Sequence, residues 1–180
     1  MDQPTIDGIN SWFACRRASR AGLKVVLSGA GGDELLGGYD YFGRVPRIHR
    51  AARRLRRLPF ANWAVRRFGP LAAPRNPKMA GLLECGPTLP GAYLLARAVL
   101  LPFGLDTVLD EGMVREGLGR LCPLERIAAT IRPDPGSDGA RMIALVTSNY
   151  MRNQLLRDGD WASMAHTVEL RMPFVDWPVL

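Results

Sequence analysis

The sequence has few of the side chains that most often carry chemistry in small proteins. Its 180 residues include two histidines, three cysteines and only two lysines, Lys24 and Lys78. Cys15, Cys85 and Cys122 lie far apart, and an odd, dispersed set argues against both a disulfide framework and a zinc site. We therefore expect reduced, mostly buried thiols and a cytoplasmic location.

Long apolar stretches are scarce as well. The longest candidate, residues 92–103, is interrupted by Arg97 and Pro102 and is shorter than the ~18 residues that a membrane span needs. The first four residues, Met1 to Pro4, lack the basic start and apolar core of a secretory signal. We therefore expect no membrane partner.

The sequence is rich in arginine and in core-forming residues. Hydrophobic residues make up 47% and charged residues 23%, and the net charge of +7 comes from 24 Lys+Arg against 17 Asp+Glu. This composition allows a packed core and excludes global disorder, while the positive charge requires a nucleic-acid or membrane-surface partner to be considered.

Arginines are densest between residues 44 and 67. Their spacing predicts an amphipathic helix whose basic face carries Arg44, Arg47, Arg50, Arg54 and Arg57 and whose opposite face carries Val45, Ile48, Ala52 and Leu55. Pro59 should end it, a short helix should follow to Phe68, and residues 69–77 should form a loop. Apart from Trp63 and Phe68, no aromatic stacking set is interleaved among these arginines, so we expect a solvated or covered face rather than a nucleic-acid partner.

The first residues predict half of an α/β crossover unit. Thr5 or Asp7 can cap a helix with an apolar stripe that includes Ile9, Phe13 and Cys15, and Gly22 should end it. The apolar run that follows, residues 23–27, is too short for a helix and is rich in β-branched residues. It reads as a strand buried on both faces.

A polar, glycine-rich turn follows the predicted strand, at residues 28–39. Open α/β sheets bind ligands at this end of a strand. The turn lacks the lysine of a Walker A loop, and Glu34 stands where a dinucleotide fingerprint has its third glycine. Two interpretations remain open: a phosphate cradle in which Asp33 holds Mg²⁺, or a connector in which Asp33 caps a helix.

The later sequence is predicted to be helical. Apolar segments at residues 93–101 and 124–131 are typical of buried helices. Residues 133–136 form a turn signal, after which Ser137 or Asp138 can cap a long helix through about Leu156. Residues 157–160 should break this helix, and residues 163–169 can form a final turn.

Two blocks resemble motifs of the asparagine synthetase family. Residues 27–39, Leu-Ser-Gly-Ala-Gly-Gly-Asp-Glu-Leu-Leu-Gly-Gly-Tyr, resemble the second nucleotide-site motif of its synthase domain. Residues 163–176 resemble its late motif, which also ends in Arg-x-Pro-Phe-x-Asp. A third block, residues 2–8, is similar to a segment found in a subgroup of asparagine-synthetase-like proteins. The resemblance implies an α/β parent fold of the PP-loop ATP pyrophosphatase type, of which this chain would form a mostly helical piece with one or two parallel strands.

The resemblance also implies an activity. Family members use ATP to adenylate a carboxylate, that of aspartate or an analogue, and ammonia from glutamine then displaces AMP to form an amide. Carried over by position, the nucleotide contacts are Ser28, Gly29, Gly31 and Gly32, and Asp33 would hold Mg²⁺. Glu34, Gly37, Gly38 and Tyr39 would support the turn, Glu169 and Arg171 would form a buried pair, and Met164 and Ala165 would lie near the ammonia passage. No catalytic residue is assigned.

The sequence also departs from the family pattern. It lacks the first nucleotide motif, Ser-Gly-Gly-x-Asp-Ser, and the glutaminase domain, and Ala30 stands where asparagine-forming members carry an acidic residue. Residues 1–180 therefore resemble part of a synthase domain, truncated at both ends, which would need the missing segments as partners and be inactive alone. The alternatives are an inactive scaffold or interaction module, and a basic RNA- or DNA-binding module.

Overall fold

Helices account for most of the chain, and its strands form a single parallel pair within the part that the structure describes. A computed structural model describes residues 5, 7–72 and 77–176. The elements in chain order are α1 (Asp7–Arg20), β1 (Val25–Leu27), α2 (Gly32–Leu36), α3 (Tyr41–Leu55), α4 (Ala61–Ala72), η1 (Pro77–Gly81), α5 (Leu82–Cys85), α6 (Leu89–Arg97), η2 (Pro102–Thr107), α7 (Glu111–Leu121), α8 (Pro123–Ala129), α9 (Asp138–Val146), the π-helical η3 (Thr147–Leu155), α10 (Leu156–Met164), β2 (Glu169–Arg171) and η4 (Pro173–Val175). The prediction of a mostly helical piece with one or two parallel strands is confirmed.

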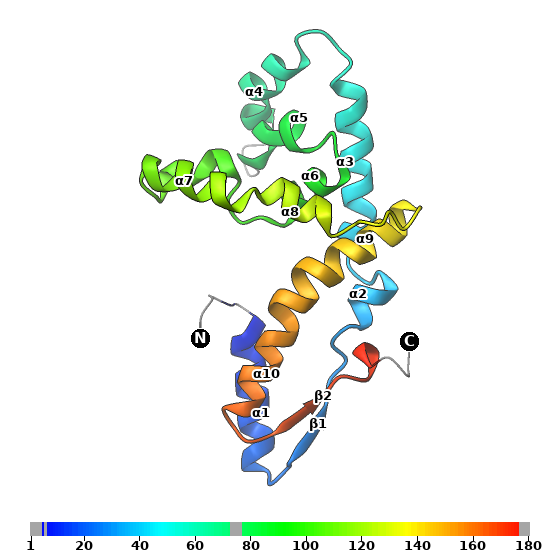
Figure 1. Cartoon of the computed structure of the whole chain (residues 1–180), viewed down its shortest axis with the longest axis vertical. Coiled ribbons are helices and arrows are strands. Elements are labelled where there is room, and N and C mark those ends of the chain that lie inside the picture. The colour runs from blue at the N-terminus through cyan, green and yellow to red at the C-terminus, as the bar shows by residue number, and fades with distance from the viewer. Residues whose placement is uncertain (1–4, 6, 73–76, 177–180) are drawn as a thin grey trace. The chain divides into compact units, whose positions relative to one another are not determined.

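The chain divides into two units. Unit 1 comprises residues 1–39 and 139–180, and unit 2 comprises residues 40–138. In unit 1, β1 and β2 pair in parallel with Val26 opposite Leu170, and helices α1 and α10 lie side by side next to them (Figure 1). Gly159 of α10 lies close to the sheet, because a Cβ there would be 2.5 Å from Met172 Cε and 3.1 Å from Leu170 Cδ2.

The prediction that the first strand is buried on both faces is wrong. Val25 is 42% exposed and Leu27 is 71% exposed, and both side chains point to the face opposite that of Val26, since side chains alternate along a strand. Only β2 pairs with β1 among the described residues, and α10 packs on β2. Parallel sheets normally have both faces covered. One face of this sheet therefore presents apolar side chains to solvent.

Helix α1 is held to α10 by a buried carboxylate. Asp158 of α10 is 2% exposed; its Oδ2 accepts a hydrogen bond from the Thr5 hydroxyl, and its Oδ1 accepts one from Trp161 Nε1 at 3.2 Å. The Thr5 hydroxyl in turn accepts the Gly8 N–H at 3.0 Å, which confirms Thr5 as a cap. Of the predicted apolar stripe, Cys15 is buried.

Two residues of the predicted stripe, Ile9 and Phe13, are instead 54% and 57% exposed. That part of the stripe is wrong. Unit 1 buries the side of α1 that carries Gly8 and Cys15, because a close contact with α10 needs small residues.

The long C-terminal helix continues where a break was predicted. Helix α9, η3 and α10 follow one another without interruption from Asp138 to Met164. Residues 157–160 combine two carboxylates and a glycine, a composition that favours a loop. Tertiary contacts override this preference, because Asp158 is hydrogen-bonded in the core and Gly159 allows the helix to approach β2. The final turn predicted at residues 163–169 is one residue too long, because Glu169 is the first residue of β2.

Unit 2 has its own apolar core. It is built from Ala52 of α3, Leu82, Leu83 and Cys85 of α5, Leu95 of α6 and Leu101, with Ile48 and Leu55 packed against it. The predicted apolar face of α3 is thus confirmed, and its arginines are exposed. Helix α4 continues to Ala72, so the first four residues of the loop predicted at residues 69–77 are helical. Residues 73–76 of that predicted loop lie outside the described part of the chain. The two other predicted helices begin earlier, at Leu89 and Pro123.

By length and composition alone, the stretch Leu89–Thr107 could cross a membrane. It includes residues 92–103, the apolar run that Arg97 and Pro102 interrupt. Helix α6 ends within this stretch at Arg97, and Leu89, Ala92 and Leu95 are buried inside unit 2. The core helix of a soluble protein can meet the same criteria of length and composition, so this single stretch is weak evidence for membrane insertion.

Candidate nucleotide-binding turn

The glycine-rich turn begins where β1 ends and is hydrogen-bonded to β2. The Ser28 N–H donates to the Arg171 carbonyl at 2.8 Å, which extends the ladder by one residue. The Ala30 N–H then donates to the Ser28 hydroxyl at 3.2 Å, and the Gly32 N–H donates to the Gly29 carbonyl at 3.1 Å. Among the described residues, the Gly29 N–H has no acceptor. The turn therefore keeps a backbone donor available at the carboxyl end of a strand.

Gly31 is the position in this turn that requires glycine. Its φ of 95° and ψ of −23° are a backbone conformation that side chains disfavour. A Cβ at Gly31 would also lie 2.8 Å from Val175 Cγ2. Gly32 faces the ring of Phe174, 3.6 Å from where its Cβ would be. The turn thus packs directly on η4, so the structure brings together the two sequence blocks that resemble family motifs.

The buried side chain of Glu34 stabilises this conformation of the turn. Its side chain is 1% exposed, accepts the Gly31 N–H at 3.0 Å and accepts the Tyr39 hydroxyl at 2.6 Å. The Tyr39 ring packs edge-on against that of Tyr150, with centroids 6.4 Å apart. A buried carboxylate needs such partners, because an unpaired one would be costly. Glu34 and Tyr39 therefore act as structural supports, as the sequence predicts.

Glu34→Ala should destabilise the chain by about 2 kcal/mol or more, because it leaves the Gly31 N–H and the Tyr39 hydroxyl without their acceptor. Chemical denaturation followed by circular dichroism measures this loss. Glu116→Ala is the matched control: its carboxylate pairs with Arg120 at 2.6 Å but is 63% exposed, so we expect a change within about 0.5 kcal/mol. Equal effects of the two substitutions would show that Glu34 does not support the turn.

Asp33 lies inside the first turn of α2 and does not cap it. The N-cap position belongs to Gly31, whose N–H is accepted by the Glu34 side chain and not by Asp33. The interpretation of Asp33 as a helix cap is therefore wrong. Its exposed carboxylate lies against Gly38, where a Cβ would be 2.1 Å from Asp33 Oδ1. Gly38 thus leaves room for the Asp33 carboxylate beside the turn.

A cavity of about 400 Å³ opens at the carboxyl ends of the two strands. It is lined by Leu27, Arg171, Met172, Pro173, Val175 and Asp176. Open α/β sheets place ligands at this end of their strands. Asp176 and Arg171 are therefore candidate ligand-contacting residues. From the sequence, Asp176 was only part of the late motif, and Arg171 was expected to pair with Glu169. The spacing Arg-x-Pro-Phe-x-Asp was the signal that could have identified them.

The pair predicted between Glu169 and Arg171 forms, but it is not buried. Arg171 Nε donates to Glu169 Oε1 at 2.8 Å, and the side chains of Arg171 and Glu169 are 61% and 57% exposed, respectively. Each side chain belongs to the same uncovered sheet face as Val25 and Leu27, which lie opposite them in the register. The hydrogen bond from Arg171, helped by its positive charge, lowers the pKa of Glu169. Met164 and Ala165 are also exposed, and their proximity to an ammonia passage stays a prediction.

The donor set around the turn fits Mg²⁺ bound together with a nucleotide. Among the described residues, no group of three or more His, Cys, Asp or Glu side chains could hold a metal alone. Mg²⁺ usually takes only one or two protein carboxylates and completes its shell with water and substrate phosphates. Asp33 provides one exposed carboxylate, four residues after the Gly29 N–H that has no acceptor among the described residues. The turn could therefore hold a metal only when phosphates supply further oxygens.

Comparison with known proteins gives the same assignment for the whole chain. The profile of the family described as asparagine synthase matches residues 1–180. Proteins named "Putative asparagine synthetase (glutamine-hydrolyzing)" from Mycobacterium bovis and Mycobacterium tuberculosis are 31% identical over 186 residues, which covers 98% of this chain and 26% of each relative. The chain thus spans about a quarter of the length of these relatives. No solved structure matches it significantly. The chain therefore belongs to the asparagine synthase family.

Proposed function

We propose that this chain supplies a nucleotide-contacting turn to an ATP- and Mg²⁺-dependent enzyme that forms an amide from a carboxylate and ammonia. The observation that carries the proposal is the arrangement of the glycine turn. The open Gly29 N–H follows β1, whose last residue Leu27 lines the cavity of about 400 Å³, and the Asp33 carboxylate follows in the first turn of α2.

Each residue of the turn has a distinct role in this proposal. Ser28 and Gly29 contact the nucleotide phosphates, and Gly31 and Gly32 let the backbone approach them without a side chain in the way. Asp33 would hold Mg²⁺, which neutralises phosphate charge when it is bound. Glu34 keeps the turn in the receptive conformation through its bond to the Gly31 N–H. None of these residues needs to exchange a proton with the substrate.

The partner of this chain is, in our proposal, the remainder of a longer synthetase. The exposed Val25 and Leu27 support it, because a parallel sheet with one bare apolar face is an incomplete core. Leu36 of α2 adds to the exposed apolar surface at 80% exposure. The substrates would be aspartate or an analogue and, following the name of the relatives, ammonia from glutamine. The chain by itself would bind nucleotide weakly and would not catalyse amide formation.

Titration of the ¹⁵N-labelled chain with Mg·ATP tests the proposal. We expect saturable shifts of the amide resonances of residues 28–33 and of Asp176, with an affinity near the millimolar range, about −4 kcal/mol. These shifts should weaken when Mg²⁺ is omitted or when Asp33 is replaced by Asn. The titration is run at about 200 mM salt, which suppresses non-specific binding of phosphates to exposed arginines.

The alternatives predict different spectra. An inactive scaffold predicts no saturable shift in the turn at any nucleotide concentration. A basic nucleic-acid-binding module predicts shifts confined to the arginines of α3 and stronger binding of an oligonucleotide than of Mg·ATP. Either result would contradict the proposed nucleotide contact.

A further inference from the structure

Unit 2 contains a long segment in which every charged side chain is positive. Between Asp40 and Glu84 the sequence carries ten arginines and one lysine and no acidic residue. Most exposed cations on a protein are balanced by nearby carboxylates or simply face water. A cation that is partly covered and lacks a carboxylate partner is different, because burial without compensation is unfavourable.

Lys78 meets this description. It belongs to η1, and the described residues provide its ammonium with no carboxylate partner. Burial lowers the pKa of Lys78, and repulsion from the guanidinium groups of Arg44 and Arg97 lowers it further. Arg44 has one acidic neighbour, Asp40, at 3.8 Å, but both side chains of that pair are more than half exposed. An exposed pair of this kind compensates little charge.

Lys78 and Arg44 line one cavity together with apolar side chains. The cavity has a volume of about 230 Å³, and its other walls are Ile48, Met79, Leu82, Leu95 and Ala96. Leu82 and Leu95 belong to the core of the unit and are only 9% and 5% exposed. The cavity therefore combines two cationic side chains with an apolar lining that includes core residues.

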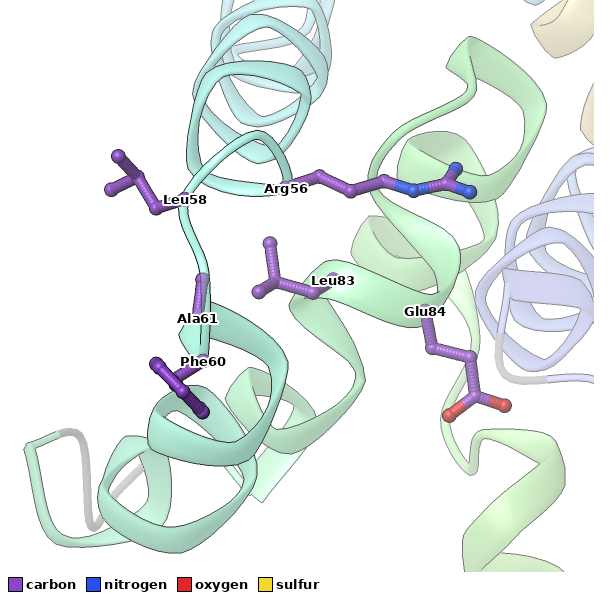
Figure 2. Close-up of a pocket in the computed structure, with 6 residues that line it drawn as sticks. All are labelled: Arg56, Leu58, Phe60, Ala61, Leu83 and Glu84. Atoms are coloured by element: carbon purple, nitrogen blue, oxygen red, sulfur yellow. The ribbon is translucent and has the colours of Figure 1, made fainter.

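Two other cavities in unit 2 lack this combination. Figure 2 shows a cavity of about 380 Å³ lined by Leu58, Phe60, Ala61 and Leu83 together with Arg56 and Glu84, so that it carries one charge of each sign. Another, of about 200 Å³, is lined by Arg50, Arg53, Arg54 and Arg57 without any apolar wall. Only at Lys78, among these three cavities, do like charges meet an apolar surface.

We propose that the Lys78 cavity binds a small amphipathic anion, a carboxylate attached to a hydrocarbon chain of about five carbons. The carboxylate would lie between the Lys78 ammonium and the Arg44 guanidinium, whose planar fork matches two carboxylate oxygens. The hydrocarbon chain would lie on Ile48, Leu82 and Leu95. Since each buried methylene contributes about 0.8 kcal/mol, each added carbon should tighten binding by up to roughly fourfold.

The scarcity of lysine makes this site directly observable. Reductive methylation with ¹³C-formaldehyde labels Lys24, Lys78 and the N-terminal amine and retains their positive charge. Titration with hexanoate should shift the Lys78 methyl resonance in a saturable way and raise the pKa read from it, because the carboxylate stabilises the charged amine. The Lys24 resonance, from unit 1, serves as the internal control and should not move.

Ligand and protein variants make the test specific. Acetate and inorganic phosphate should bind at least tenfold more weakly than hexanoate, and hexylammonium should not shift Lys78 at all. Arg44→Gln should weaken hexanoate binding by about tenfold or more, since it removes a charge-assisted contact. Arg47→Gln is the matched control, because Arg47 is an exposed arginine of the same helix that does not line the cavity. Circular dichroism verifies that both variants fold.

Several outcomes would overturn the proposal. If the Lys78 methyl resonance shows no saturable shift up to about 20 mM hexanoate, the cavity does not bind hexanoate with a Kd in the millimolar range. Equal affinities for acetate and hexanoate would show that the apolar lining of the cavity does not contribute to binding. An equal shift of the Lys24 methyl resonance would indicate general charge screening and no specific site. If hexyl phosphate bound tenfold more tightly than hexanoate, the preferred ligand would be a phosphate ester and the proposed carboxylate would be wrong. The glycine turn of unit 1 enters none of these measurements, so they are independent of the proposed nucleotide contact.

Discussion

Asp33→Asn should lower ATP-dependent amide formation about a hundredfold in an enzyme assembled from this chain and the remaining length of its relatives. The substitution keeps the size of the side chain beside Gly38 but removes the charge that would attract Mg²⁺. A hundredfold loss corresponds to about 3 kcal/mol of transition-state stabilisation. Steady-state release of pyrophosphate with aspartate, at several Mg²⁺ concentrations, is the measurement. High Mg²⁺ should restore part of the rate, because concentration offsets a weakened affinity.

The fold itself should not respond to this substitution. Asp33 does not cap α2, and its carboxylate is exposed, so the melting temperature of Asp33→Asn should match that of the parent. Asp160→Asn provides a control, since Asp160 is an exposed carboxylate of α10 that lies outside the glycine turn. If the Asp33→Asn enzyme turns over like the parent at limiting Mg²⁺, Asp33 is ruled out as a metal ligand.

Gly91→Ala should destabilise unit 2 by about 3 kcal/mol or more, the upper end of the usual cost of overpacking. Gly91 lies at the start of α6, where its N–H donates to the Thr88 hydroxyl at 3.1 Å. A Cβ at this position would be 2.0 Å from the Cys85 carbonyl oxygen and 2.8 Å from the carbonyl carbon. These are backbone atoms at the end of α5, so the clash cannot be relieved by rotating a side chain.

A thermal melt of the whole chain, with amide exchange to follow unit 2, measures the effect. The midpoint of unit 2 should fall by more than about 10 °C, given 4–8 °C per kcal/mol for a domain of this size. Gly117→Ala in α7 is the matched control: nothing lies within 4 Å of its added Cβ, so it should be neutral or stabilising by up to about 1 kcal/mol. A midpoint for Gly91→Ala within about 2 °C of the parent would show that α5 and α6 do not approach this closely.

Local sequence signals succeeded where a single segment contained all the information. The three- and four-residue spacing of α3 predicts which side of the helix enters the core, and Val45 and Ala52 are indeed buried there. The glycine turn was likewise located from its composition and its place after a β-branched run. The same local reasoning left two roles open for Asp33, because a helix cap and a metal ligand favour the same residue type.

Longer-range interactions explain the predictions that were wrong. Asp158 and Gly159 resemble helix breakers, yet they lie within α10 because Thr5, 153 residues away, hydrogen-bonds to Asp158 and the sheet packs on Gly159. The expectation of a fully buried first strand assumed neighbours on both faces. β1 has only β2 beside it in the described chain, so Val25 and Leu27 are exposed.

The sequence by itself determined the family of this protein, its helical character and the location of the glycine turn, because each depends on short contiguous patterns. The tertiary structure decided that Glu34 is the buried support of the turn, that the strand ends open into a cavity beside Arg171 and Asp176, and that Lys78 shares an apolar cavity with Arg44. Each of these depends on contacts between segments far apart in the chain. Spacing along a sequence carries no information about such contacts until folding brings the segments together.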